Sequence, residues 1–235
     1  MTSSPKLYLL FLPFLLLFTV SCKPAGEESK LVKPNVIIIY ADDLGYGDLS
    51  CYNPESKIST RNIDQLAREG MSFTDAHSAA SFCTPSRYSI LTVTYCWRSQ
   101  AASELQGGFD KPIIGDDEKT LGTLFKSNDY NTAAIGKWHV GMRWALKEGE
   151  SEQEEENIDF EKPLLTTPID QGFDYFFGTS GCTSDDSPFA FIENRKVLGL
   201  PLSYIENLQV VGDFNRESGE VFYKDVLQAR EWAHE

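Results

Sequence analysis

Apolar residues along the chain form short runs and helical spacings in an alternating order. The continuous β-branched run Asn35–Tyr40 (NVIIIY) is typical of a parallel strand that is covered on both faces. The segment Thr60–Glu69 has apolar residues at helical spacing, a hydroxyl residue as a cap and Gly70 as a stop, which predicts a helix. Three further elements are expected: a strand at Met71–Thr74, a helix at Lys119–Ser127 and a strand at Asn131–Ile135. This order predicts an α/β fold with a mixed, mostly parallel sheet between helices.

Residues 1–21 have the pattern of an export signal. Lys6 precedes the apolar run Leu7–Val20, which is too short and too weakly flanked for a membrane-spanning helix. Cys22 resembles the lipidated cysteine of bacterial lipoproteins, and the alternative is an ordinary cleaved signal near the same place. Polar residues 22–34 suit a tether before a folded body at residues 35–235. We therefore expect an exported protein, either secreted or held as a periplasmic, outer-membrane or cell-surface lipoprotein.

Composition narrows the possible functions. With 41% apolar and 24% charged residues in 235 positions, the chain can bury a core. Its net charge of −14 argues against nucleic acid as a partner, because phosphate backbones attract basic proteins. The five cysteines form no CxxC pair, which disfavours a zinc ribbon or a thioredoxin-like site. In an oxidising compartment Cys51, Cys96 and Cys182 could pair, and their spacing does not decide which.

Three polar clusters follow three predicted strands. Asp42 and Asp43 follow the first strand, residues 83–87 (CTPSR) follow the next, and Lys137 with His139 follow a third. Binding and catalytic groups of such sheets lie beyond the carboxyl ends of the strands, so we expect these three loops to converge on one site.

The adjacent carboxylates of Asp42 and Asp43 point to a cation. Past a buried strand they repel each other and lose hydration, and their hard oxygens suit Ca²⁺ or Mg²⁺. The alternative is a solvated turn in which the pair only bends the chain.

The segment CTPSR predicts the start of a helix. Pro85 stands where a proline opens a helix, so Cys83 would lie at the positive helix end, where an anion can dock. Arg87, one turn further on, can direct its guanidinium toward the group at position 83. The C-x3-R spacing differs from the C-x5-R loop of cysteine-based phosphatases. A buried structural cysteine before a proline-started helix is the alternative interpretation.

The segment GKWHVG carries the third cluster. An extended backbone would put Lys137 and His139 on one side and pack Trp138 inward on the other. A histidine beside a tryptophan can equally be a packed residue with no catalytic role. For His77, six residues before Cys83, we expect a hydrogen-bonded structural role rather than a place in the pocket.

Several of these segments resemble one enzyme family. CTPSR matches the C-x-P-x-R signature of type I sulfatases, whose cysteine is oxidised during biosynthesis to formylglycine. NVIIIYADDLGYGDLSCY resembles that family's first strand and metal loop, GKWHVG its lysine and histidine loop, and QGFDYFFG and PFAFIENRKV later segments of its N-terminal domain. Over residues 33–200 the chain thus resembles a sulfatase of the arylsulfatase or N-acetylgalactosamine-6-sulfatase type. The resemblance implies the alkaline phosphatase-like fold and hydrolysis of sulfated sugars or aryl sulfate esters.

The resemblance also implies catalytic roles. Cys83 would become formylglycine, Arg87 would hold its hydrated form, Lys137 would bind a sulfate oxygen, and His139 would hydrogen-bond a hydroxyl of the hydrate. One hydroxyl of the hydrate would attack sulfur and the second would expel sulfate, whereas a serine would be left sulfated. A formylglycine-generating maturase is the implied partner. Residues 91–94 (LTVT) differ from the LTGR common in the family, so modification could be less efficient or depend on another maturase.

The metal ligands implied by the resemblance are Asp42, Asp43 and the modified residue at Cys83, holding Ca²⁺ or, alternatively, Mg²⁺. Family members are longer and supply an Asp–Asn pair, a histidine and a second lysine beyond the position of Glu235. We therefore expect an N-terminal portion of the catalytic domain, incomplete at its C-terminus and inactive as this chain alone. The acidic segment 148–161 is expected to be a solvated insertion loop, and residues 220–235 have a roughly helical apolar pattern.

Two other functions stay open. A phosphate or phosphonate monoester hydrolase of the same superfamily would share the carboxylates but normally uses Thr or Ser as its nucleophile, against which Cys83 argues. The third possibility is a non-catalytic, membrane-tethered remnant. Calcium titration would discriminate, because tight binding by this chain alone would contradict an incomplete site.

Overall fold

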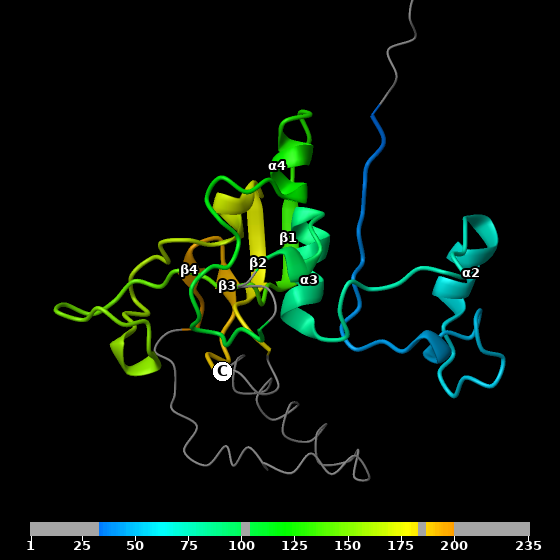
Figure 1. Ribbon diagram of the computed structural model, residues 1–235, viewed down its shortest axis with the longest axis horizontal. Helices are drawn as coiled ribbons and strands as arrows, with labels where there is room; N and C mark the ends of the chain where they lie inside the picture. The colour runs from blue at the N-terminus through cyan, green and yellow to red at the C-terminus, as the bar shows by residue number, and fades with distance from the viewer. Residues whose placement is uncertain (1–32, 100–103, 183–186, 200–235) are drawn as a thin grey trace, which may run out of the picture. The chain divides into compact units, whose positions relative to one another are not determined.

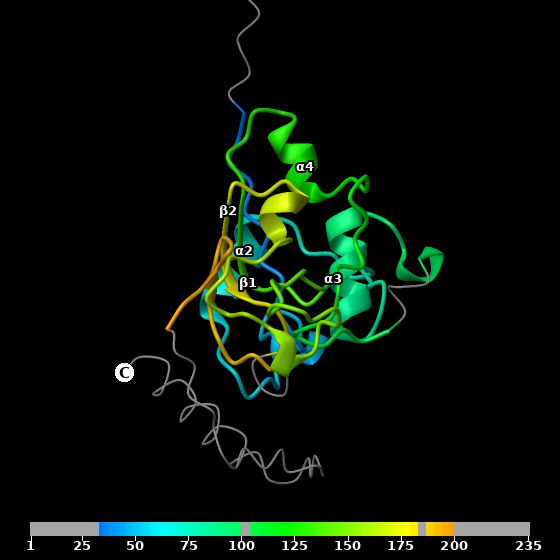
Figure 2. The same ribbon diagram turned by 90° about the vertical axis from the view of Figure 1, so that its left-hand side faces the viewer.

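The computed structural model describes residues 33–99, 104–182 and 187–199 (Figures 1 and 2). The chain divides into two compact units, residues 1–41 and residues 42–235. The helices are α2 (Arg61–Glu69), α3 (Cys83–Thr92) and α4 (Leu121–Lys126), and the strands are β1 (Ala133–Lys137), β2 (Tyr175–Thr179), β3 (Ile192–Glu193) and β4 (Lys196–Val197). Short 3-10 turns lie at Tyr46–Asp48, Cys96–Arg98, Glu155–Asn157 and Pro168–Gln171. Within the described ranges, no helix has the length and apolar character needed to cross a bilayer.

The strands form one sheet in the order β1-β2-β3-β4 (Figure 1). β1 and β2 are parallel, with Ala133 opposite Tyr175 and Lys137 opposite Thr179. β3 and β4 form a short hairpin, and β3 pairs antiparallel with β2. The mixed α/β sheet is confirmed, but in the described part of the chain the hairpin leaves only the β1–β2 pairing parallel, short of the mostly parallel sheet expected.

Two glycines bring the ends of β1 and β2 close together. Gly136 and Gly178 lie opposite each other, and Gly136 has a φ of 105°. A Cβ built on Gly178 would lie 1.8 Å from the carbonyl oxygen of Gly136, so no side chain fits there. This close pairing holds the end of β1, where Lys137 is the last strand residue.

The predicted helices are confirmed with small differences at their ends. α2 follows Thr60 and ends at Glu69, with Gly70 next, as expected. α4 begins after Thr120, whose hydroxyl accepts a hydrogen bond from the Thr123 backbone N–H while the Thr123 hydroxyl accepts one from the Thr120 N–H. α3 contacts α4, and Figure 2 shows these two helices next to each other. β1 is confirmed two residues later than predicted, which extends the strand to Lys137.

Two predicted strands are wrong within the described residues. Asn35–Tyr40 and Met71–Thr74 belong to no strand or helix. The side chains of Ile37 and Ile39 are more than four-fifths exposed, and Met71 is also largely exposed. β-branched and apolar residues favour a paired, half-buried surface, but a strand forms only where a neighbouring backbone completes the hydrogen-bond ladder.

The hydrophobic core is built around the residues that follow β1. The alternate residues Trp138, Val140, Met142 and Trp144 are all buried, so Trp138 packs inward as expected. They pack with buried apolar residues from the sheet and from two loops: Phe176, Ile192, Val197, Ile158 and Leu164. The chain that leaves β1 is therefore held rigidly by its own side chains.

The acidic segment 148–161 is largely exposed, as predicted, but it is not a free insertion. Ile158 is 1% exposed and pairs with Leu146 in an isolated β-bridge. Gln153 accepts a hydrogen bond from the Trp144 backbone N–H and donates to the Met142 carbonyl. Residues 1–32 and 220–235 lie outside the described residues, so the export signal, the lipidated Cys22, the tether and the C-terminal helical pattern stay predictions.

Candidate active site

Cys83 is the first residue of α3. Phe82 before it is extended, and Pro85 lies in the first helical turn, where its missing N–H costs no helical hydrogen bond. Cys83 itself is partly exposed, whereas Thr84 and Pro85 are buried. The predicted position of Cys83 at the positive end of a helix is confirmed.

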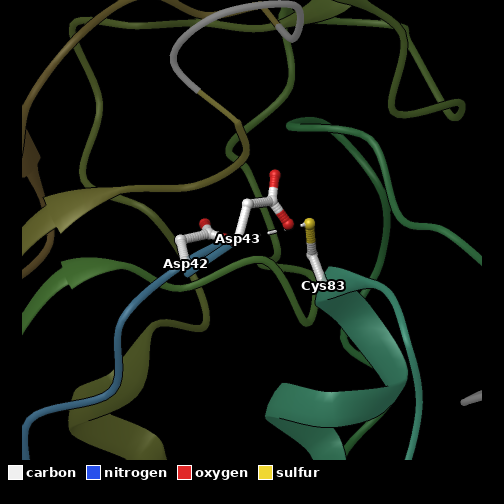
Figure 3. A group of neighbouring side chains, drawn as sticks. All are labelled: Asp42, Asp43 and Cys83. Carbon is white, nitrogen blue, oxygen red and sulfur yellow. Dashed lines mark hydrogen bonds between the residues drawn. The ribbon is translucent and has the colours of Figure 1, made fainter. Parts of the chain in front are cut away.

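The carboxylate of Asp42 lies beside the Cys83 thiol. The Sγ atom of Cys83 is 3.8 Å from Oδ1 of Asp42, and Figure 3 shows the thiol and the two neighbouring carboxylates together. Single donor atoms of Asp42, Asp43 and Cys83 all lie within 4.8 Å of one another. Asp43 has a left-handed backbone, with φ 55°, which turns the chain directly after Asp42.

Two cations meet the other oxygen of Asp42. Oδ2 lies 2.9 Å from Nζ of Lys137 and 3.0 Å from Nη2 of Arg87. The side chains of Lys137 and Arg87 are 13% and 12% exposed, against 36% for Asp42. Nζ of Lys137 is also 3.2 Å from the Cys83 sulfur. The structure thus brings the predicted residues of three separate loops into direct contact.

These contacts fix the charges of the cluster. Burial raises the pKa of the Asp42 carboxyl, but the hydrogen bonds and charges of Lys137 and Arg87 outweigh burial and hold that pKa below its ordinary value. Burial lowers the pKa of Lys137, and its hydrogen bonds with Asp42 and Cys83 more than reverse this and raise it. At neutral pH Asp42 is therefore an anion and Lys137 a cation.

Arg87 also holds the backbone of the third loop. One turn after Cys83, its Nη1 donates a short hydrogen bond to the carbonyl of Lys137, while Nη2 pairs with Asp42. The guanidinium thereby joins α3, the end of β1 and the loop of Asp42. Its planar fork suits two acceptors at once, which an ammonium group would not bridge in the same way.

His139 lies two residues after Lys137 and is 1% exposed. Its φ is 58°, so the extended backbone expected through this segment is wrong at this residue, and alternation does not decide where its ring points. The backbone of His139 is held by the neighbouring chain, since its N–H donates to the carbonyl of Ser180 at 2.9 Å. Its catalytic role stays a prediction.

The sequence also singled out His77 and three cysteines. The His77 side chain is 82% exposed and bonds to Asp75 at 2.7 Å, so it has a local partner rather than a place among the charged residues. Cys51 is exposed and Cys96 is buried, and no disulfide joins these two. For Cys182 the sequence indicates only a possible disulfide, yet the negative charge of its sulfur is one of the causes that raise the pKa of Lys137, after the hydrogen bonds with Asp42 and Cys83. No local sequence pattern marks that proximity.

The donors present suit a hard divalent cation in part. The two carboxylates are hard oxygen ligands, whereas the thiol sulfur of Cys83 is a soft ligand that Ca²⁺ and Mg²⁺ bind poorly. Two carboxylates and two side-chain cations leave the cluster with no net charge to attract an anion. A divalent cation would supply the missing positive charge.

Comparison with known proteins decides the family. The sequence profile of the Sulfatase family matches residues 34–227, a range that contains the whole cluster. The chain belongs to the sulfatase family. The resemblance stated from its motifs is confirmed.

Relatives of this sulfatase come from bacteria and animals. N-acetylgalactosamine-6-O-sulfatase of Bacteroides thetaiotaomicron is 39% identical over 178 residues, which are 76% of this chain and 32% of the relative. Human steryl-sulfatase is 38% identical over 174 residues, which are 72% of this chain and 27% of the relative. The sulfatase chain therefore spans about a third or less of the length of these relatives.

A solved structure agrees with the fold. A chain from a study of the metabolism of multiple glycosaminoglycans by Bacteroides thetaiotaomicron superposes with a TM-score of 0.62 and 38% identity. The match covers 72% of this sulfatase chain and 32% of that chain. The alkaline phosphatase-like fold of sulfatases is confirmed for the part of the chain that superposes.

Proposed function

We propose that this sulfatase chain carries the nucleophile end of a sulfuric ester hydrolase that cleaves sulfate monoesters of sugars or aryl alcohols. The observation that carries the proposal is the contact of Cys83 with Lys137 and Asp42 at the start of α3. A nucleophile at this place has a cation on one side and a potential metal ligand on the other. Membership of the sulfatase family supports the choice of sulfate over other esters.

Residue 83 would act after conversion to formylglycine. As its hydrate, this group supplies two hydroxyls, one to attack sulfur and one to expel sulfate. Arg87 would hold such a hydroxyl, and its hydrogen bonds to the Lys137 carbonyl and to Asp42 support this role. The Lys137 ammonium would bind a sulfuryl oxygen and stabilise the negative charge that grows there, and its distance of 3.2 Å from the Cys83 sulfur supports this role. His139 would exchange a proton with a hydroxyl of residue 83.

Asp42 and Asp43 would hold Ca²⁺ or Mg²⁺. The metal would supply positive charge to the sulfuryl oxygens. Conversion of Cys83 to formylglycine would also replace a soft sulfur by an oxygen, which suits a hard cation better than the thiol does. Modification and metal binding would therefore favour each other.

Export and maturation complete the proposal. The signal-like residues 1–21 and Cys22 would direct the protein out of the cytoplasm and anchor it through a lipid. A formylglycine-generating enzyme would modify Cys83. A sulfated carbohydrate is the favoured substrate, because a similar protein is an N-acetylgalactosamine-6-O-sulfatase.

The test is sulfate release by the full-length protein that contains this chain, co-expressed with a formylglycine-generating enzyme. We expect release from sulfated sugars or aryl sulfates in proportion to the converted fraction of residue 83, and none from Cys83→Ala. No turnover by fully converted protein on a broad panel of sulfate esters would contradict the proposal. A preference for phosphate monoesters would favour the alternative hydrolase of the same superfamily.

A further inference from the structure

α3 holds two carbonyl groups of the chain that leaves β1. Arg87 donates to the carbonyl of Lys137, and Thr84 donates from Oγ1 to the carbonyl of His139 at 3.0 Å. Thr84 and Arg87 are three residues apart and therefore lie on one face of the helix. The two carbonyls belong to the residues for which catalytic roles are proposed.

The Thr84 hydroxyl both donates and accepts a hydrogen bond. It accepts a hydrogen bond from the backbone N–H of Gln106 at 3.0 Å, so its own hydrogen is directed to the His139 carbonyl. Thr84 is 0% exposed, and its bond to the His139 carbonyl is buried. If the hydroxyl were removed, the buried His139 carbonyl and the part-buried Gln106 N–H would both lose this partner.

His139 needs such a restraint because of its backbone conformation. A φ of 58° is costly for a residue with a side chain, and it persists only where neighbours hold it. The N–H of His139 is held by Ser180 and its carbonyl by Thr84, so the peptide groups on both sides are fixed. Of these two restraints, only Thr84 is a direct neighbour of the nucleophile in the sequence.

We propose that Thr84 is a positioning residue that sets the place of the His139 imidazole relative to residue 83. The expected effect on kcat rests on the proposed function, whereas the expected effect on the His139 backbone does not. Thr84 links the nucleophile and the proton-transferring residue through one side chain. Loss of its hydroxyl releases the His139 backbone and misplaces the ring.

The test is made in the full-length protein that contains this chain. It compares Thr84→Val, which keeps the shape and removes the hydroxyl, with Thr84→Ser, which restores it. Thr92→Val is the matched control, since its hydroxyl is also buried on α3 but has only local partners: it donates to the Tyr88 carbonyl and accepts from the Thr94 N–H at 3.3 Å. The converted fraction of residue 83 is measured by mass spectrometry in every variant, and rates are given per converted molecule.

For Thr84→Val we expect kcat on a sulfate ester to fall about 10–100-fold with little change in KM, and the pH dependence of kcat to shift. Thr84→Ser should return kcat to within about threefold of the original, and Thr92→Val should leave it unchanged. An unchanged kcat and pH profile in Thr84→Val would overturn the inference.

Amide hydrogen exchange provides a second readout that needs no activity. Thr84→Val should speed exchange at Gln106 and His139 by about tenfold or more, while Thr84→Ser and Thr92→Val should not. Unchanged exchange would overturn the inference even in an inactive protein. If the original protein releases no sulfate but Thr84→Val speeds exchange, the proposed function fails while the positioning role stands.

Discussion

Replacing Asp42 by asparagine tests the charged cluster most sharply without relying on activity. The change keeps the size of the side chain but removes the negative charge that Lys137 and Arg87 share. Both cations are mostly buried, so the variant leaves two positive charges side by side with little water to solvate them. We expect the folded state to lose stability.

The size of the loss follows from the exposure of the partners. Exposed ion pairs contribute about 0–1 kcal/mol, and breaking a buried pair costs about 3–5 kcal/mol. Asp42 is 36% exposed while its partners are 12–13% exposed, so an intermediate loss of about 2 kcal/mol is expected. For a domain of this size, that loss corresponds to a fall in Tm of about 4–8 °C.

The contributions of Asp42 and Lys137 to stability change with pH in opposite directions. Because the folded-state pKa of Asp42 is lowered, its contribution is fully present above the unfolded value of about 3.9 and is lost as pH falls through the folded value. Because the pKa of Lys137 is raised, its contribution is present below about pH 10.4 and is lost as pH rises through the folded value. The difference in the free energy of unfolding between the original protein and Asp42→Asn should therefore be constant from about pH 5 to 9. It should become smaller below about pH 4.

The assay is urea unfolding followed by tryptophan fluorescence, in chelator so that no bound metal contributes. Asp116→Asn is the matched control, because Asp116 is exposed and distant in sequence from the cluster. Equal stability of Asp42→Asn and Asp116→Asn at pH 7 would refute the ion-pair cluster. If the stability difference between the original protein and Asp42→Asn stays the same in acid, the assigned role of the Asp42 charge is refuted.

Three further changes test other parts of the structure. Gly178→Ala should destabilise the fold by at least about 3 kcal/mol, because its Cβ would lie 1.8 Å from the β1 backbone. In the same urea titration, the control Gly47→Ala should cost far less, because the nearest atom to its Cβ is 3.6 Å away. The hydrogen bond from Lys126 is the main cause that lowers the pKa of Asp174 to about 2. The original protein should therefore lose stability between about pH 4 and 2, and Asp174→Asn should not show that loss. Identical curves of stability against pH for the two proteins would contradict this. Lys137→Met should lower kcat for sulfate release by about 100-fold in protein with fully converted residue 83, and an unaltered kcat would exclude its role at the sulfuryl oxygens.

The sequence predicted the local features of the site better than its long-range ones. The start of α3 at Cys83 follows from Pro85 and its neighbours, and the approach of Lys137 follows from its place at a strand end. Both depend on residues that are close together in the chain. The convergence with Asp42 came from the family resemblance and from the general rule that loops gather at the carboxyl edge of a sheet.

Other features have no local signature. The bond from Thr84 to the His139 carbonyl spans 55 residues, and a threonine in a buried helix turn gives no sign of its acceptor. The left-handed backbone of His139 is equally invisible in the sequence, because glycine or asparagine usually marks such positions. The β-branched run Asn35–Tyr40 predicts a strand, but strand pairing depends on a distant partner that a local run does not reveal.

The central claim, that residue 83 works as a hydrated aldehyde between Asp42 and Lys137, is tested most directly by mass spectrometry of an enzymatically active preparation. Trypsin releases this residue in the peptide Glu69–Arg87. We predict that the peptide carries an aldehyde at position 83, which reacts with a hydrazide, in a fraction that matches the fraction of active sites. A preparation of full activity in which the peptide keeps an unmodified cysteine thiol would contradict the account.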